Sequence, residues 1–577
     1  MSGDKLSRGV ERIRERAAEL AGRMGSTARA SASMAQERAV LRMIGVDGLD
    51  RAGRPLAWSV SDRYCSERAK LASGVLLPLS VAMTEYELPP RETALEVASG
   101  AIDLRLEAEL LDRPDRLATA ERRALSLLEG AGARIDANRT ATREMREVLG
   151  MPPEPRLGVG VRASEVDAAA AEIRSLVRQG AAIVEVRVPA SWELAESRRQ
   201  AGLDAGGAFG SNSFGAGGAF GQGPGGSARG SESRGMTARG LATVGRAAER
   251  ARLSARRKSG QASAEPVQPP AGGVAVPAGS QRGLAELRKA ADEAAAERNC
   301  YASLMTVTSA FAAPEQAAVA AFERVDIVEA DPIREIVEDN VDPARALADH
   351  SFAHRIQARA GTRVLLGAGP LALGAEIAAG LPSDGPARAG RALALQALGV
   401  ELALADGLDP ERIYLSCVPS WIVGDGDTAA APLQAFLRRM LFPDHGLVIS
   451  GPLVGLTTPS AGAALVATMT VSGTSMVLDR AVRDVSAAAR DLNAVSVTAR
   501  SLRNVFWPEG GVNAATEDAA VRILDEALRT LEQLDSEGWS SLLGHDAGDA
   551  TERLGRTAVA DRAVGPATSA ALVDRFF

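Results

Sequence analysis

LGVGV at residues 157–161 and IVEVRV at 183–188 are short apolar runs, and the Ala-rich stretch EVDAAAAEIRSLVRQ (165–179) lies between them. Short apolar runs that alternate with helical segments are typical of βα units around a parallel sheet. This stretch therefore predicts one strand, one helix and a second strand. The same rhythm continues along the chain, with further apolar runs at 302–307, 325–328, 363–366, 413–417 and 447–450.

The number of these runs favours a closed architecture. Seven are visible, and an eighth strand inside residues 463–471 would complete a (β/α)8 barrel of the TIM type. A doubly wound open sheet would give the same rhythm, so the periodicity alone leaves both architectures open. The barrel would occupy residues 151–485, between a helical N-terminal arm (1–150) and a helical C-terminal extension (486–577). Residues 202–283 are rich in Gly, Ser, Arg and Pro, which predicts a disordered insertion within the barrel.

Composition excludes several classes of protein. The formal net charge of −7 makes general binding to nucleic acids or anionic membranes unexpected. No window reaches the roughly 18 apolar residues of a membrane span, and the charged N-terminal segment lacks the apolar core of a secretory signal. The cysteines Cys65, Cys300 and Cys417 are far apart and do not have metal-ligand spacing. A cytoplasmic location and no bound metal are expected.

The amino-acid sequences of several segments resemble those of one family. They are QERAVLRMIGVDGLD (36–50), EVASGAIDL (96–104), AFERVDIVEAD (321–331), GLDPE (407–411) and RMLFPDHGL (439–447). In this order and at this spacing, they resemble the large (α) subunit of D-lysine 5,6-aminomutase. The resemblance covers most of the chain outside the Gly-rich insertion. It implies a (β/α)8 barrel preceded by a helical arm.

The resemblance also implies chemistry. The family uses adenosylcobalamin and pyridoxal phosphate for a radical 1,2-shift of an amino group on lysine. A small β subunit supplies the cobalt-binding histidine in a DxHxxG loop, and the lysine that binds the pyridoxal aldehyde. None of the four histidines of this chain lies in such a loop, and none of its lysines ends a predicted barrel strand. A cobalamin-binding β-type partner is therefore expected, in a hetero-oligomer that acts on lysine or a related amino acid.

Site residues follow from the resemblance, at the carboxyl ends of the strands. Arg187, aligned with a one-residue gap, and Ser309 correspond to residues that contact pyridoxal phosphate. Asn340 corresponds to an aspartate that holds the charged end of the substrate. Val307 stands where the family has a tyrosine that stacks on the pyridoxal ring, and Val454 where it has a lysine that pairs with the substrate carboxylate. The catalytic residues remain unassigned.

Cys417 is a further difference from the family, which has a histidine at this position. Because of these differences at the site, two functions remain open. The first is an α-subunit-like aminomutase component with an altered substrate or impaired activity. The alternative is a non-catalytic paralogue, which acts as a scaffold or regulatory subunit for a cobalamin-binding partner.

One further cluster lies outside these correspondences. Asp339, Asp342, Asp349 and His350 form an acidic run that also contains Arg345. A carboxylate beside a histidine can act in acid–base catalysis. The favoured interpretation is a solvated helix face.

Overall fold

The structure is a computed structural model of the chain. It describes fourteen segments, and all statements below concern them: residues 2–29, 31–65, 68–163, 165–187, 281–308, 312–337, 341–367, 385–417, 430–450, 459–479, 484–506, 514–539, 562–564 and 568–576. The predicted insertion, 202–283, lies outside these segments except for its last three residues.

Within the described segments, eight parallel strands form a closed barrel in the order of the chain, and the first strand pairs with the last. The barrel prediction is therefore confirmed over the open sheet. The strands are β2 (Arg156–Gly160), β3 (Ile183–Arg187), β4 (Ser303–Val307), β5 (Ile327–Glu329), β6 (Arg363–Leu366), β7 (Ile413–Cys417), β8 (Gly446–Ser450) and β9 (Met476–Asp479).

The position predicted for the eighth strand was wrong. Residues 463–471 lie inside the helix α19 (Pro459–Ser472), and the strand that closes the barrel is β9, just after it. The run AALVATMTV at 463–471 is apolar except for Thr468 and Thr470, and periodicity cannot distinguish a buried helix from a buried strand in such a run. The turn at 473–475 marks the true boundary between the two elements.

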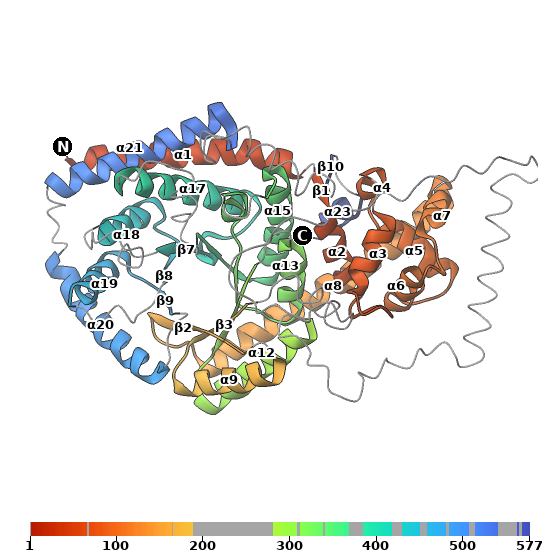
Figure 1. Cartoon of the computed structure of the whole chain (residues 1–577), viewed down its shortest axis with the longest axis horizontal. Coiled ribbons are helices and arrows are strands. Elements are labelled where there is room, and N and C mark those ends of the chain that lie inside the picture. Colours follow the sequence, from red (N-terminus) through yellow and green to blue (C-terminus); the bar gives the residue numbers. More distant parts are fainter. Residues whose placement is uncertain are drawn as a thin grey trace, which may run out of the picture.

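Helices surround the barrel, and at least one follows each strand (Figure 1). In chain order they are α9 (Val166–Gln179), α12 (Gln281–Arg298), α13 (Ala313–Phe322), α14 (Pro332–Val337), α15 (Pro343–Ala360), α17 (Gly385–Ala405), α18 (Ala430–Leu441), α19 and α20 (Val485–Phe506). A short 3-10 helix, η2 (Pro410–Arg412), leads into β7. The first helix of the chain, α1 (Ser2–Arg29), and the long C-terminal helix α21 (Ala514–Glu537) lie side by side across α17.

Side chains of each strand alternate between two cores. One core lies between the strands and the surrounding helices, and it includes α1 and α21. The other fills the interior of the barrel, as expected for a packed barrel rather than a pore. The buried residues of the interior core are Ala182, Ile183, Met305, Ile327, Leu365, Tyr414, Val448, Met476 and Leu478.

Gly446 allows the Tyr414 ring to pack inside the barrel. A Cβ atom at Gly446 would overlap the Tyr414 ring, so the Gly446→Ala variant is expected to be less stable by about 1–3 kcal/mol. Chemical denaturation measures this loss, and the additional change Tyr414→Leu should restore part of it. Gly22→Ala is the control, because Gly22 lies in the helix α1 with nothing near its Cβ position. Equal stabilities of the two alanine variants would contradict this packing.

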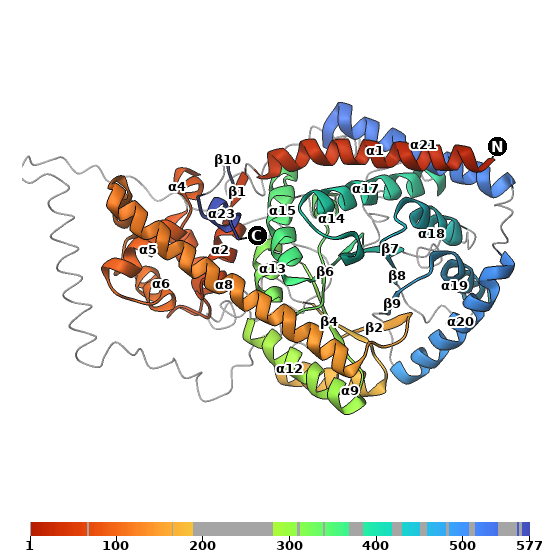
Figure 2. The ribbon, with the colours of Figure 1, turned by 180° about the vertical axis from the view of Figure 1, so that it is seen from behind.

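The helices that follow α1 form an arm beside the barrel (Figure 2). The last of them, α8, runs from the arm to the barrel and contacts α13 and α15. The elements of the arm are α2 (Met34–Met43), α3 (Leu56–Tyr64), α4 (Arg68–Ser73), α5 (Leu76–Glu85), α6 (Pro90–Ser99), α7 (Leu104–Ala108), the 3-10 helix η1 (Glu109–Asp112) and α8 (Pro114–Leu149).

The end of the chain returns to this arm. Strand β10 (Arg562–Val564) pairs antiparallel with β1 (Ser31–Ser33), the short strand that links α1 to α2. Helix α23 (Thr568–Val573) packs against α2, α4, α5 and α8. Helix α23 therefore shares one core with the helices of the arm.

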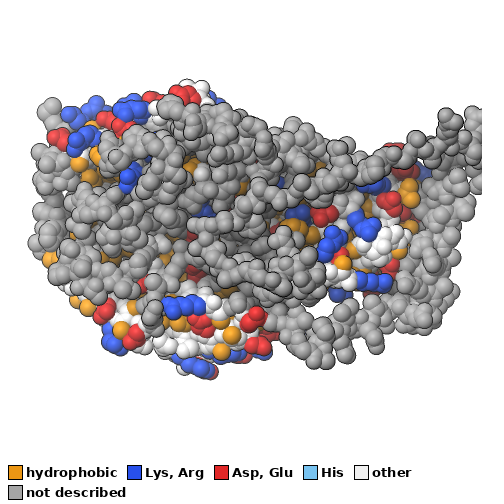
Figure 3. Space-filling model, in the orientation of Figure 1, with side chains coloured by type: hydrophobic (Ala, Val, Ile, Leu, Met, Phe, Trp, Pro, Cys, Tyr) orange, Lys and Arg blue, Asp and Glu red, His pale blue; other side chains and the backbone are white. Residues whose placement is uncertain are grey.

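The surface of the described segments is mixed in charge. On the face drawn in Figure 3, acidic and basic side chains lie next to each other along the edges of the molecule. Within the described helices, none is long and apolar enough to cross a membrane.

Candidate active site

The carboxyl ends of the strands form the mouth of the barrel, where barrel enzymes place their active sites. Parts of the loops that follow β2, β3, β4, β6, β7, β8 and β9 lie outside the described residues. The described part of the mouth therefore consists mainly of the strand ends, of residues 161–163 after β2 and of the turn between β5 and α14.

Polar side chains occupy inward positions near these strand ends. Side chains two residues apart on a strand share a face, so Glu185 and Glu329 follow the interior residues of β3 and β5. By the same alternation Val307, Ser416 and Ser450 face inward from β4, β7 and β8. The side chains of Glu185 and Glu329 are only 2% exposed. The described floor of the mouth is thus polar and contains two buried carboxylates.

Glu329 belongs to a bonded network at the end of β5. Arg334 on α14 donates to Oε1 of Glu329 (3.0 Å) and to the carbonyl oxygen of Thr308 (3.1 Å). Asp331 accepts from the backbone N–H of Ile333 (2.9 Å) at the start of α14, and from the N–H of Gly367 (2.7 Å) after β6. These bonds join the ends of β4, β5 and β6 and hold Arg334 beside the mouth.

The predicted site residues are described only in part. Arg187 is the last residue of β3, and its Cα pairs with that of Val307 at the end of β4. The structure thus brings these two positions together. The side chain of Arg187, and all of Ser309, Asn340 and Val454, lie outside the described residues.

Sequence comparison links this barrel to one family. Residues 5–194 and 266–416 match the model of the D-lysine 5,6-aminomutase TIM-barrel domain of alpha subunit. The chain belongs to this family. It is also 24% identical over 450 residues to the lysine 5,6-aminomutase alpha subunit of Fusobacterium nucleatum, a match that covers 78% of this chain and 71% of the relative. It is a divergent member, and the match includes the arm as well as the barrel.

Cys417 faces away from the interior of this aminomutase-family barrel. It is the last residue of β7, and it belongs to the core between strands and helices rather than to the interior core. Burial raises the pKa of its thiol, which the charge of Arg438 only partly offsets. A buried, protonated thiol on the outer face is packed as an apolar group.

The acidic run was wrongly predicted to be a solvated helix face. Asp342 caps α15 by accepting from the N–H of Arg345 (2.9 Å). Asp349 is buried and accepts from Ser33 and from Nε of Arg345 (3.2 Å). Burial raises the pKa of Asp349, while Arg345 and Ser33 lower it. Arg345, Asp349 and His350 are buried because α15 packs against α13, α1 and β1. Asp339 lies outside the described residues.

Two buried histidines continue along the same helix. Nε2 of His350 lies 3.0 Å from Oε1 of Glu335 on α14, and Nδ1 of His354 lies 3.1 Å from Oδ2 of Asp406 after α17. Burial lowers the pKa of His354, against the opposing effect of Asp406. Both pairs connect helices of the outer layer. Their positions support a role in packing rather than acid–base chemistry at the mouth.

The described residues of the mouth do not fit a phosphate group. A pyridoxal phosphate needs cationic or N–H donors for its dianion. The guanidinium of Arg334 is already bonded to Glu329 and to the Thr308 carbonyl. Glu185 and Glu329 would repel an anion, and Val307 offers no aromatic face for the pyridoxal ring. Glu329 already has a cationic partner in Arg334, and Glu185 adds a second negative charge.

The two mouth carboxylates were missed as individual residues, although the sequence contains a signal for them. Glu185 interrupts the apolar strand sequence IVEVR, and Glu329 ends the strand sequence IVE. A charged residue within an apolar strand of a barrel is a candidate for the polar interior near the mouth. Alternation along each strand would have selected both positions.

Proposed function

We propose that this chain is the α-type component of an adenosylcobalamin- and pyridoxal-phosphate-dependent aminomutase, which acts in the cytoplasm. It would bind lysine or a related amino acid and take part in a radical 1,2-shift of an amino group. The observation that carries the proposal is the family match, which runs through the arm and six of the eight barrel strands. A match of this extent favours the proposal that the chain assembles with a second subunit, as the family's alpha subunits do.

A partner chain is central to the proposal. The Fusobacterium relative is an alpha subunit, which suggests a second kind of subunit for this chain as well. We propose a cobalamin-binding β-type partner that contributes most contacts to both cofactors. Arg187 and Ser309 remain our candidates for contact with pyridoxal phosphate, and Asn340 for contact with substrate.

The carboxylates of the mouth suggest which part of the substrate this chain holds. Glu329 is buried beside the inward position of Val307, and Glu185 is buried one layer deeper, beside Met305. Arg334 already balances the charge of Glu329, and the second buried carboxylate, Glu185, favours a further cationic hydrogen-bond donor at this end of the barrel. We propose that an ammonium group of the amino acid binds at this end of the barrel.

A second candidate function rests on Val307. The resemblance implies an aromatic ring at this position, and the valine side chain cannot stack on a pyridine ring. This favours a non-catalytic paralogue, kept as a scaffold or regulatory subunit for a cobalamin-binding partner.

The absorption spectrum of the native complex distinguishes the two candidates. The full chain, tagged in its own host, is purified with any bound partner under dim light. The aminomutase proposal expects corrinoid absorption together with pyridoxal phosphate absorption, and a second, smaller chain in stoichiometric amount. A corrinoid without pyridoxal phosphate would support the scaffold function. A colourless chain without a partner would contradict both.

A further inference from the structure

The last described residues of the chain lie where the arm meets the barrel (Figures 1 and 2). They are 562–564 and 568–576, here called the C-terminal clasp. Its strand β10 pairs with β1, and its helix α23 packs against α2, α4, α5 and α8. The side chains of Leu572 and Val573 are buried in the core of the arm. Although it follows the barrel in the sequence, the clasp therefore helps to form this core.

The clasp also connects the arm to α15, a helix of the barrel. Arg355 of α15 pairs with Asp574, and Arg359 donates to the carbonyl oxygen of Phe576 (2.5 Å). Arg359 also pairs with Asp136 of α8 at 2.7 Å. Because α15 belongs to the barrel and α8 to the arm, these contacts join the two parts at the clasp.

Ser569 fixes the position of α23 against the backbone at the start of α5. Its side chain is buried, and its Oγ accepts from the N–H of Leu76 (3.2 Å). A Cβ atom at Gly74 would overlap this oxygen and lie only 2.8 Å from the backbone nitrogen of Ser569. Any side chain at residue 74 would therefore displace α23.

A buried carboxyl group lies next to the same serine. Glu37 of α2 is 0% exposed, its Oε2 accepts from the N–H of Val75 (2.7 Å), and Ser569 contacts it as well. Its Oε1 has no hydrogen-bond partner among the described residues. A protonated carboxyl group is neutral at this position, whereas a buried carboxylate without a cation is costly. The clasp thus covers a group whose charge opposes burial.

The other titratable groups around Glu37 are uncharged near neutral pH. They are Tyr64 at the end of α3 and Cys65 after it, and burial raises the pKa of both side chains. The elements α5 and α23 present the Val75 N–H and the Ser569 hydroxyl. Among the described residues of α13, α15 and the other helices around α2, no charged side chain shifts the pKa of Glu37, which burial raises to about 7.

We infer that the C-terminal clasp is a pH-sensitive device, which stays docked on the arm while Glu37 carries a proton and is released when Glu37 ionises. Release of α23 lets water reach the carboxylate, and solvation of the charge offsets the lost apolar contacts. A carboxyl pKa that is raised in the docked state favours docking fully below the solvated value of about 4.3. This contribution is lost as pH rises through about 7.

Helix α2 extends the effect of release to the edge of the mouth. Arg42, near the other end of α2, donates from Nε to Oε2 of Glu315 (3.0 Å), and Trp58 of α3 donates to the same oxygen (3.2 Å). Glu315 lies in the first turn of α13, the helix that follows β4. One helix thus contacts both the clasp and the start of α13.

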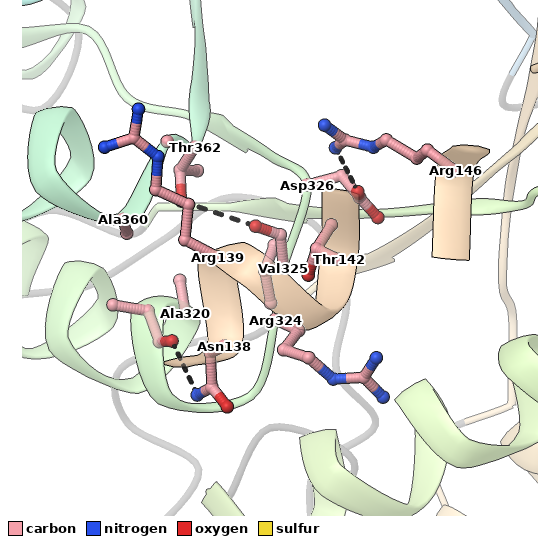
Figure 4. Close-up of a pocket in the computed structure, with 12 residues that line it drawn as sticks. Asn138, Arg139, Thr142, Arg146, Ala320, Arg324, Val325, Asp326, Ala360 and Thr362 are labelled. Atoms are coloured by element: carbon pink, nitrogen blue, oxygen red, sulfur yellow. Dashed lines mark hydrogen bonds and ion pairs between the residues drawn. The ribbon is translucent and has the colours of Figure 1, made fainter. Parts of the chain in front are cut away.

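Helix α8 holds the arm on the barrel without help from the clasp. Nδ2 of Asn138 donates to the carbonyl oxygen of Phe322 (2.7 Å), and Arg146 pairs with Asp326 (Figure 4). Release of the clasp should therefore loosen β1, α2 and α23 and leave α8 in place.

Hydrogen exchange of the full-length chain, read by mass spectrometry at pH 6 and pH 8, measures this local opening. After correction for the intrinsic pH dependence of exchange, protection of the clasp in the wild type is expected to be about tenfold lower at pH 8. Glu37→Gln should give equal protection at both pH values, because its amide does not ionise. Glu92→Gln, at an exposed residue of α6, should follow the wild type. Peptides of α8 that contain Asn138 are the internal reference and should stay protected.

Gly74→Ala tests the seat of the clasp independently of pH. It is expected to lower protection of the clasp at least tenfold at both pH values, because its Cβ displaces Ser569. Gly45→Ala is the matched control: Gly45 also has a left-handed φ (+93° against +73°), but no atom lies within 4 Å of its Cβ position.

Three results would overturn the inference. One is equal protection of the clasp in the wild type at both pH values, and another is an unchanged pH dependence in Glu37→Gln. The third is a loss of protection in α8 as large as that in the clasp, since global unfolding would then explain the effect. Equal protection of the clasp in Gly74→Ala and Gly45→Ala would overturn the docking of Ser569 against Gly74.

Discussion

The Asp326→Ala variant is expected to lose about 3–5 kcal/mol of unfolding free energy, because it leaves buried cationic groups without a partner. Asp326 is fully buried and precedes β5. It accepts from Arg288 (3.0 Å), from the hydroxyl of Tyr301 (2.7 Å) and from the N–H of Leu304 (2.8 Å), and it also pairs with Arg146. This one carboxylate thus connects α8, α12, β4 and β5.

The stability that Asp326 contributes is expected to depend on pH. Burial alone would raise the pKa of Asp326, but Arg288, Arg146 and the hydrogen bonds from Tyr301 and Leu304 hold it below its usual value. A depressed pKa in the folded state gives stability that is present above the unfolded pKa of about 3.9 and is lost as pH falls through the folded pKa.

Urea denaturation at pH 7 measures the Asp326 effect, with Glu147→Ala as the control. Glu147 is 69% exposed and pairs with Arg143 at 3.9 Å on the surface of α8, so its loss should cost less than about 0.5 kcal/mol. Losses of the same size in the two variants would contradict the role of Asp326.

Glu37→Gln is expected to become more stable relative to the wild type as pH rises from 5 to 8. Burial raises the pKa of Glu37 to about 7, although hydrogen bonds from the Val75 N–H and from Ser569 lower it. A raised carboxyl pKa means that the folded state holds the proton more tightly. Its stabilising contribution is full below the unfolded pKa of about 4.3 and is lost as pH rises to 7 and above. The expected change in the difference between variant and wild type is about 3 kcal/mol.

Denaturation of the two proteins at several pH values measures the Glu37 effect. Glu92→Gln is the control, since Glu92 is exposed in the first turn of α6 and its variant should follow the wild type. The docking of α23 is part of the same test, because Ser569 contacts both Glu37 and the N–H of Leu76 (3.2 Å). A pH-independent difference between Glu37→Gln and the wild type would refute a buried, protonated Glu37.

The architecture could be predicted because it depends on local patterns. Seven barrel strands are visible as apolar runs, and the resemblance favours the closed barrel. The eighth strand was misplaced into residues 463–471 because that run has no clear polar face, which a strand or a helix would show equally. No local sequence pattern predicts the pairing of β1 with β10, because the two strands lie more than 500 residues apart in the sequence.

The candidate site was harder to predict than the fold. Glu185 and Glu329 can be found by alternation along their strands, but their burial depends on eight strands closing together. Asp349 and His350 illustrate the opposite error. Their charged run is typical of a solvated surface, and only the packing of α15 against the barrel and the arm makes it an interior. In both cases, packing between segments that are distant in the sequence determines whether the side chains are buried. Short sequence motifs do not reveal such packing.

The most direct test of the central claim is turnover by the native complex. Lysine labelled with 15N at the terminal amino group is incubated anaerobically with the complex, adenosylcobalamin and pyridoxal phosphate, and the position of the label is read by NMR. The account predicts that the label moves to the adjacent carbon and that the reaction stops when this chain is left out of the reconstituted mixture. An unmoved label with lysine and related diamino acids, in a complex that contains both cofactors, would contradict it.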